Sequence, residues 1–288
     1  MTVNKIPLAL RSQFSRTFTI AALLCCFGLP NGAIAQAAGG AAVQQRSDNS
    51  ASALPDAPLP NSDEQESATL RGTPVRVLKD QAAIWTSPAR IRKGDLVWLV
   101  PLAAVTGVGI ATDHHAMASV VSHDAGFNNA NVNASNVLVG GLIAAPVALF
   151  GVGYLKGNEH AREAGLLSGE ALADGLVVEQ GMKLIFWRER PAANDARGHF
   201  FQGSAGTDSS FPSSHSVLAW SSAAVMAGEY PSRWAQVGIY TMATGVSLTR
   251  VMGQEHFPTD VLVGSAAGWL IGHYIFRTHH RHGLLRTR

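Results

Sequence analysis

Residues 165–187 read GLLSGEALADGLVVEQGMKLIFW, and residues 188–191 continue as RERP. Small and apolar residues fill this stretch without the strict polar-apolar alternation of a β-strand. The pattern therefore predicts a helix, which Pro191 ends. Four charged side chains interrupt it, so the helix either lines a polar site or belongs to a bundle that is not fully membranous. They are Glu170, Asp174, Glu179 and Lys183.

The same apolar, strand-free pattern recurs on both sides of this segment. After a short helical piece around Leu78–Trp85, the predicted helices are Leu96–Ala111, Val137–Leu155, Gly165–Trp187, Ser213–Gly228, Trp234–Leu248 and Asp260–Phe276. We therefore expect an all-α protein, a helical bundle of about six core helices within residues 76–288. Only Val137–Leu155 reaches the length and apolarity of a membrane span, which needs about 20 residues.

The composition limits the classes of protein to which the chain can belong. Apolar residues make up 47% and charged residues 15% of the 288 residues, whereas about 25% charged is usual. The formal net charge of +2 is too small to favour nucleic-acid binding. The basic clusters Arg90–Lys93 and Arg277–Arg288 are interpreted as solvated or juxtamembrane charge.

The N-terminus has the pattern of an export signal. A basic region with Lys5, Arg11 and Arg16 precedes the apolar segment Phe18–Leu29, and Ala33–Ala35 fits a small-x-small cleavage site. We expect residues 1–35 to be a signal peptide, with an uncleaved anchor as the alternative.

Two further features concern the chain after cleavage of this signal. Cys25 and Cys26 lie inside the predicted signal, so cleavage would leave no cysteine for a disulfide or thiol chemistry. Residues 36–75 are rich in Ala, Gln, Ser and Pro without apolar periodicity, and we expect a disordered linker.

Three short clusters carry candidate chemistry. In KLIFWRERP (183–191), Lys183 and Arg190 are seven residues apart, so both leave one face of a helix and could grip phosphate oxygens. The competing interpretation is a solvated basic face, which Arg188 beside them favours.

The second cluster, PSSH (212–215), follows a Gly- and Ser-rich loop and opens a helix. Pro and Ser are ordinary residues at a helix start, but free N–H groups there also favour an anion. Ser213 and the backbone of Ser214 could donate to phosphate oxygens, and His215 could give a proton to a leaving group.

The third cluster is RVMGQEHFPTD (250–260). Asp260 lies four residues after His256, a spacing that lets its carboxylate accept from one imidazole nitrogen and leaves the other nitrogen able to attack phosphorus. Taken singly, a capping Asp and a surface His would explain the same residues.

Together, Lys-x6-Arg-Pro, Pro-Ser-x-His and Arg-x5-His-x3-Asp, in this order, resemble the signature of the phosphatidic acid phosphatase type 2 and vanadium haloperoxidase superfamily. The resemblance covers about Leu96–Phe276. It implies that His256 is the nucleophile that forms a phosphohistidine, that Asp260 orients it, and that His215 is the general acid. The phosphate-binding residues that it implies are Lys183, Arg190, Ser213, Ser214 and Arg250.

No metal or other cofactor is implied. The adjacent His114 and His115 lack the spacing of ligands on one helix face. Two positions depart from the family pattern: Thr249 stands where Ser is common, and Ser214 stands where Gly is common. A Ser still offers its N–H if the position does not need a positive φ.

The resemblance implies a metal-independent phosphatase that hydrolyses phosphomonoesters or pyrophosphates. The apolar helices favour a lipid-linked substrate over a small phosphoester. The alternatives are a vanadium-dependent haloperoxidase and a non-enzymatic envelope protein. No code for the natural substrate can be recognised in Ala192–Phe211, and nothing in the sequence indicates the oligomeric state.

The membrane topology contains a conflict. Basic residues flank the predicted helices on one side, and Asp113–Asn136, with no Lys or Arg, has the composition of an external loop. An exported N-terminus followed by six crossings would, however, turn the site inward. Three arrangements are open: a peripheral bundle, a bundle in which Leu96–Ala111 does not span, and an N-terminus that is not exported. We expect an exported, membrane-associated protein of the bacterial cell envelope, with its site facing the periplasm.

Overall fold

The computed structural model describes residues 70–203 and 208–280. The predicted signal peptide and residues 36–69 of the predicted linker lie outside these residues. The described part contains helices and no strand, which confirms the all-α prediction. Helix α2 (Thr73–Thr86) begins before residue 76, so the predicted linker boundary is too late by one helical turn.

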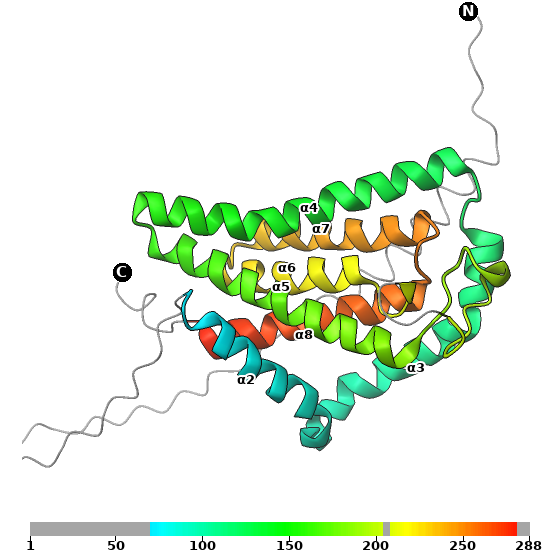
Figure 1. Ribbon diagram of the computed structural model, residues 1–288, viewed down its shortest axis with the longest axis horizontal. Coiled ribbons are helices and arrows are strands. Elements are labelled where there is room, and N and C mark those ends of the chain that lie inside the picture. Colours follow the sequence, from blue (N-terminus) through cyan, green and yellow to red (C-terminus); the bar gives the residue numbers. More distant parts are fainter. Residues whose placement is uncertain (1–69, 204–207, 281–288) are drawn as a thin grey trace, which may run out of the picture. The chain divides into compact units, whose positions relative to one another are not determined.

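The helices follow one another with short connections, except that the longer segment 187–213 joins α5 to α6 (Figure 1). After α2 come the short helices η1 (Ser87–Arg90) and η2 (Lys93–Asp95), α3 (Leu96–His115), the π-helical turn η3 (Ala116–Val120) and α4 (Ala125–Lys156). The rest of the described chain forms α5 (Glu159–Phe186), η4 (Asn194–Ala196), α6 (Ser214–Glu229), α7 (Arg233–Met252) and α8 (Pro258–His279).

Helix α6 is the centre of the bundle. One apolar cluster joins it to α4 and α7 through residues such as Leu142, Ala223 and Val246. A second cluster joins it to α5 and α8 through residues such as Leu167, Val225 and Ile271. Gly268 of α8 lies directly against the carbonyl of Val217, where any Cβ would overlap that oxygen. The α6–α8 crossing is therefore close enough to hold the starts of both helices in one position.

Two predicted boundaries are wrong in a way that affects the site. Helix α4 begins at Ala125 rather than Val137, because Asp124 caps it by accepting a hydrogen bond from the Phe127 N–H at 2.7 Å. Helix α3 ends at His115 and continues into η3. The predicted loop Asp113–Asn136 is consequently helical except for residues 121–124.

Helix α3 lies along the outside of the bundle (Figure 1). Two helical segments of the described chain, Lys93–Val120 and Ala125–Lys156, are long and apolar enough to cross a membrane by length and composition. The prediction that only the second reaches this length is wrong, because α3 runs on through η3. None of the apolar window of the first segment is buried against the rest of the protein, against 22% of the second.

Candidate active site

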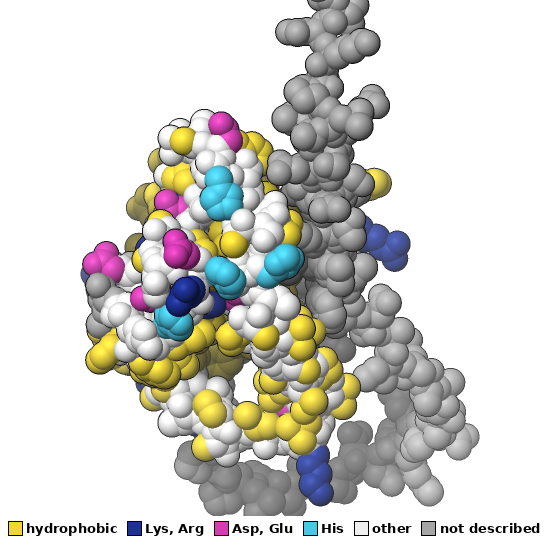
Figure 2. Space-filling model, turned by 90° about the vertical axis from the view of Figure 1, so that its right-hand side faces the viewer, with side chains coloured by type: hydrophobic (Ala, Val, Ile, Leu, Met, Phe, Trp, Pro, Cys, Tyr) yellow, Lys and Arg dark blue, Asp and Glu magenta, His cyan; other side chains and the backbone are white. Residues whose placement is uncertain are grey.

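The predicted site residues meet at one end of the bundle, where α5 ends, α6 begins and the α7–α8 loop returns (Figure 1). Figure 2 looks onto this end. Histidine, basic and acidic side chains gather in the upper half of the described surface in this view, and apolar side chains predominate in the lower half. Three segments far apart in sequence thus contribute to one polar surface beside an apolar one.

Lys183 is held in place by two neighbours. Its Nζ lies 2.9 Å from Glu179 Oε1, one turn earlier in α5, and donates to Ser214 Oγ at 2.8 Å. The Ser214 hydroxyl also donates to Glu179 at 2.5 Å. Ser214 opens α6 and is not among the residues with positive φ, so this position does not require Gly. Ser214, which stands where Gly is common in the family, therefore adds hydrogen bonds that hold the buried Lys183 in place.

Arg190 reaches the site from a loop. Helix α5 ends at Phe186, where Trp187 adopts a left-handed conformation with φ of 40°, so Pro191 does not end the helix. The expectation that Lys183 and Arg190 leave one helix face is therefore wrong. The chain turns after Trp187, and the Arg190 side chain lies against the Asp208 carbonyl at 3.2 Å instead.

Glu255 bridges two of the predicted phosphate-binding cations. Its Oε2 lies 3.0 Å from Arg190 Nη1 and 3.2 Å from Arg250 Nη2. The carboxylate is about one-third exposed, whereas Arg250 is almost buried. A negatively charged oxygen between two guanidinium groups is the arrangement that a bound phosphate oxygen would also adopt.

Two buried donors at this place have no acceptor within the described protein. They are the Ser213 hydroxyl and the Nε of Arg250. Ser213 is fully buried at the N-cap of α6, and its backbone N–H already donates to the Asp260 carbonyl at 3.1 Å. Because buried polar groups are nearly always paired, two orphaned donors beside three cations favour an anion as their partner.

His256 is buried in the α7–α8 loop, and its Nδ1 lies 2.8 Å from the carbonyl oxygen of Ser210. A carbonyl can only accept, so Nδ1 carries the proton and Nε2 keeps its lone pair. Burial lowers the pKa of His256, which keeps the ring neutral, although the Asp260 carboxylate opposes this shift. The arrangement is suited to a nitrogen nucleophile.

The spacing predicts that the Asp260 carboxylate accepts a hydrogen bond from His256, but its closest contacts are with other groups. Its Oδ2 lies 3.7 Å from His256 Nδ1, so the Ser210 carbonyl is the closer partner of the ring. Asp260 instead accepts from the Phe257 N–H at 2.9 Å and from Arg188 at 2.6 Å. It acts on His256 through charge and through the shape of the loop.

Arg188, which favoured the competing interpretation of a solvated basic face, is in fact one of the most deeply buried side chains. It lies 2.7 Å from Asp113 Oδ2 of α3 and 2.6 Å from Asp260 Oδ1 of α8. Its guanidinium carbon also lies over the rings of Phe200 and Phe257, 4.6 and 4.1 Å from their centroids. This residue joins three segments beneath the site, and no local signal in the sequence distinguishes it from Arg190.

His215 lies among the predicted cations. Burial first, and then the nearby charges of Arg250, His256, Lys183 and Arg190, lower its pKa to about 3. Burial is the largest cause of this shift, and the charged residues of the three clusters add to it. In the absence of an anion the ring is neutral at physiological pH.

Two polar residues of α4 complete the site, and the sequence analysis missed both. Asn136 Oδ1 lies 3.0 Å from His215 Nε2, and Ser135 Oγ accepts from Arg250 at 3.2 Å. Both lie in the segment that was predicted to be a loop. Two adjacent polar residues directly before the predicted apolar helix Val137–Leu155 could have indicated that they face the site.

The comparisons with known proteins point the same way. A family model described as the PAP2 superfamily matches residues 164–284. A curated protein named Lipid A 1-phosphatase, from Porphyromonas gingivalis, is 33% identical over 135 residues, which cover 45% of this chain. The chain spans only 27% of the length of that relative. No solved structure gives a significant match.

Proposed function

We propose that the protein, whose residues 164–284 match the model of the PAP2 superfamily, is a phosphatase acting on a phosphate group carried by a lipid. The observation that carries the proposal is the pair of orphaned buried donors, Ser213 Oγ and Arg250 Nε, among Lys183, Arg190 and Arg250. Donors fixed in advance around the transferring group supply most of what phosphoryl transfer requires.

His256 is the proposed nucleophile. Its Nε2 attacks phosphorus while the bond between phosphorus and the leaving oxygen breaks, giving a phosphohistidine. The Ser210 carbonyl keeps the other proton on Nδ1, and the positive charge that develops on the ring is stabilised by Asp260, 3.7 Å away.

His215 is the proposed general acid. Its pKa is lowered to about 3 in the free protein, but the negative charge of a bound phosphate offsets the cations that cause part of this shift. The ring can then hold a proton and pass it to the leaving oxygen. Water next attacks the phosphohistidine, releasing orthophosphate and returning one proton to His215.

The surroundings of the site favour a lipid-linked substrate. Leu184, Ile185, Trp187 and Phe201 are large apolar residues with 41–63% exposure. The first three follow Lys183 closely in sequence, and the Phe201 N–H donates to the Phe186 carbonyl beside them at 3.0 Å. Exposed apolar groups beside an anion site match a molecule with a phosphate and an acyl chain. The name of the relative from Porphyromonas gingivalis, Lipid A 1-phosphatase, supports the same substrate class.

Membrane association follows from α3 and α4. An apolar helix that buries none of its span against the protein is stable when lipid covers it. We propose that the protein belongs to the bacterial cell envelope and that the site faces the periplasm, in agreement with the export signal predicted for residues 1–35.

The experiment is phosphate release from a lipid phosphate in detergent, compared with a small soluble phosphomonoester. Wild-type protein is expected to prefer the lipid, and His256→Ala is expected to lose at least about 1,000-fold in turnover, because it removes the nucleophile. Its matched control is His123→Ala, since His123 is an exposed histidine of the α3–α4 connection.

Near wild-type turnover in folded His256→Ala would overturn the mechanism. Halide oxidation with added vanadate and peroxide, without phosphate release, would instead identify the haloperoxidase alternative.

A further inference from the structure

Helix α2 exposes its large apolar side chains and buries its charged ones. The residues of α2 that the bundle buries are Arg76 and Asp80, whereas Val75, Leu78 and Trp85 are 44–71% exposed. A surface helix in water has the opposite arrangement, with its apolar stripe against the core and its charges outside. The outer face of α2 therefore suits an apolar surrounding better than water.

The inner face of α2 is bound to the bundle through polar contacts. Arg76 Nε donates to Glu170 of α5 at 2.9 Å. Asp80 accepts from the Tyr274 hydroxyl at 3.1 Å, and its Oδ2 lies 2.9 Å from His279 Nε2 at the end of α8. Turning the helix about its axis would leave these buried charges without partners, so the contacts determine which face points outward.

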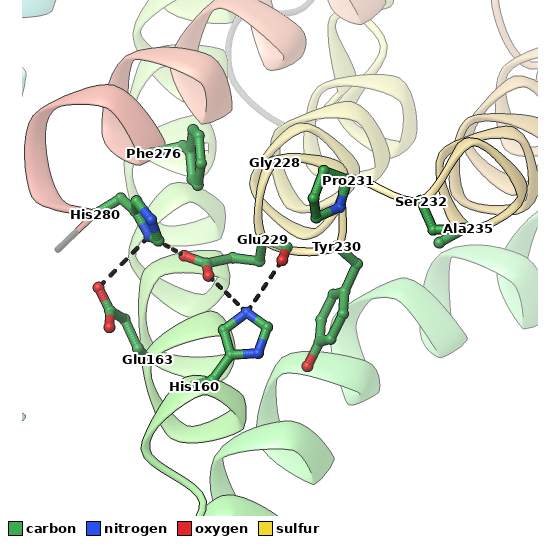
Figure 3. Close-up of a pocket in the computed structure, with 10 residues that line it drawn as sticks. All are labelled: His160, Glu163, Gly228, Glu229, Tyr230, Pro231, Ser232, Ala235, Phe276 and His280. Carbon is green, nitrogen blue, oxygen red and sulfur yellow. Dashed lines mark hydrogen bonds and ion pairs between the residues drawn. The ribbon is translucent and has the colours of Figure 1, made fainter. Parts of the chain in front are cut away.

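The part of α8 that contacts Asp80 is itself held in place. His280, next to His279, lies 3.0 Å from Glu229 Oε1 at the end of α6 (Figure 3). Glu229 Oε2 in turn lies 3.1 Å from His160 Nε2 of α5. Helix α2 is thus packed on a fixed part of the bundle.

The exposed apolar surface of α2 continues into α3. Ile91 in the connection between the two helices is exposed, and so are three residues at the start of α3, Leu96, Val97 and Trp98, with 44–79% exposure across the four. Helices α2 and α3 meet at a corner on the outside of the bundle (Figure 1). The apolar window of α3 buries none of its residues against the protein, and lipid is proposed to cover it. The same lipid would reach the adjoining face of α2.

The charges around this surface are positive. Between residues 70 and 94 the exposed charged side chains are all basic, namely Arg71, Lys79, Arg90, Arg92 and Lys93. Asp80 in this range is buried, and Asp95 after it accepts from the Arg92 N–H at 2.8 Å. Basic side chains beside an apolar surface match the anionic headgroups that lie above the acyl chains of a bilayer.

Two tryptophans mark the same level of a bilayer. Trp85 and Trp98 lie on either side of the basic connection and are each 44% exposed. Tryptophan is enriched at the boundary between the acyl chains and the headgroups, because its ring is apolar and its N–H is polar. An acidic protein partner would match the cations alone, whereas a bilayer supplies both the apolar layer and the negative charge.

We propose that α2 and the basic connection after it, residues 70–95, dock on a bilayer that contains anionic lipids. Val75, Leu78 and Trp85 lie among the upper acyl chains, and the basic side chains contact the headgroups. This surface is separate from the active site, because α3, with 20 residues and a length of about 30 Å, lies between them. It is additional to the proposed attachment through α3 and α4.

The test is a fluorescent probe on one introduced cysteine in full-length protein that is reconstituted into vesicles. Cys25→Ser and Cys26→Ser remove the natural cysteines, and Leu78→Cys provides the labelling site. The vesicles contain equal amounts of phosphatidylcholine and phosphatidylglycerol, with bromine on the acyl chains as the quencher. The probe at position 78 is expected to shift its emission to shorter wavelengths and to be quenched. A probe on His123→Cys, in the polar connection between α3 and α4, is expected to do neither.

The dependence on anionic headgroups is tested with the triple variant Arg71→Gln, Lys79→Gln, Lys93→Gln. It should lower the ratio of quenched to unquenched probe at position 78 by at least about tenfold, because each of these side chains is attracted to the anionic surface. Vesicles of phosphatidylcholine alone should give a similar loss with the three basic residues intact.

The matched control removes three exposed basic residues elsewhere, as Lys156→Gln, Arg197→Gln, Arg233→Gln. The change in net charge is the same, and quenching at position 78 should stay as it is without these changes. Circular dichroism and phosphate release in detergent, both expected to be unchanged, check that each variant is folded.

Three results would overturn the proposal. One is an unquenched probe at position 78, and another is equal quenching in vesicles with and without phosphatidylglycerol. The third is a disulfide between two Leu78→Cys chains without quenching, which would assign this face to a second copy of the protein. Protein that gives any of these results while it resists carbonate extraction would still be attached through α3 and α4.

Discussion

Among single residues, Glu255 has a position that the sequence motifs leave without a role. It lies directly before His256, and its carboxylate contacts both Arg190 and Arg250. A phosphate that binds these arginines must displace the carboxylate or share them with it. We therefore propose that Glu255 opposes anion binding at these arginines.

Replacing this carboxylate with its neutral isostere is expected to tighten anion binding. Glu255→Gln should lower the inhibition constant for orthophosphate by up to about fivefold, because a partly exposed charge pair contributes up to about 1 kcal/mol. The measurement is inhibition of phosphate release by added orthophosphate.

Glu189→Gln is the control for this effect, since Glu189 lies directly before Arg190 in the connection between α5 and α6 but contacts His199 rather than the arginines. Unchanged or weaker inhibition in Glu255→Gln would show that the carboxylate does not compete with phosphate.

Among the elements, the junction of α3, α5 and α8 determines the geometry of the site. Arg188 follows α5 and binds Asp113 of α3 and Asp260 of α8, and it also donates to Thr259 at 2.8 Å. Asp260 in turn caps α8 by accepting from the Phe257 N–H. The loop that carries His256 is thus tied down by a buried ion network rather than by apolar packing alone.

Breaking this network should affect folding and activity together. Arg188→Met keeps much of the side-chain volume but leaves Asp113 and Asp260 buried without their cation, at a cost of about 3–5 kcal/mol. We expect a lower melting temperature in detergent and loss of phosphate release.

Arg190→Met should separate the two effects. Arg190 is 30% exposed at its side chain and contacts the site directly, so activity should fall while the melting temperature stays near wild type. An Arg188→Met protein as stable as wild type would contradict the role assigned to this network.

For the whole molecule, the distribution of apolar surface bears on how the protein meets a membrane. Helices α3 and α4 pass the length and composition test for a span, whereas the other described helices do not. The apolar helices therefore do not require the six crossings that conflicted with an exported N-terminus, and we propose a bundle attached to the membrane through α3 and α4. The predicted orientation toward the periplasm stays a prediction.

Charges on these two helices should weaken membrane attachment. In liposomes, a chain that begins at Gln36 should resist carbonate extraction, while the double variant Val108→Glu, Val147→Glu should be released. Both valines are exposed on α3 and α4, and a charge at the bilayer centre costs about 2.5–3.5 kcal/mol. Starting at Gln36 removes Phe18–Leu29 as an independent anchor.

The matched control is Trp234→Glu, Val237→Glu on α7, which is exposed but does not pass the span test. Equal extraction of both double variants would show that α3 and α4 are not the membrane-binding elements.

The local sequence pattern predicted some features of the fold and the site and missed others. Apolar periodicity predicted the six main helices, and the starts of α6 and α8 were predicted to within two residues by Pro212 and Pro258 near their first turns. The start of α4 was missed because a run of Asn residues resembles a loop, whereas Asp124 caps a helix there. The residue types at the site, from Lys183 to Asp260, could be predicted because each carries its chemistry in its own side chain.

The sequence by itself determined the all-α class and the set of groups that could bind and attack a phosphate, because helix periodicity and side-chain chemistry are local properties. Only the tertiary structure decided what each group contacts. It buried Arg188 under the site, directed the His256 Nδ1–H to the Ser210 carbonyl, set Glu255 between two arginines, and gathered Glu163, Glu229 and His280 at the far end. These contacts join residues from separate helices, and their positions depend on how closely those helices cross.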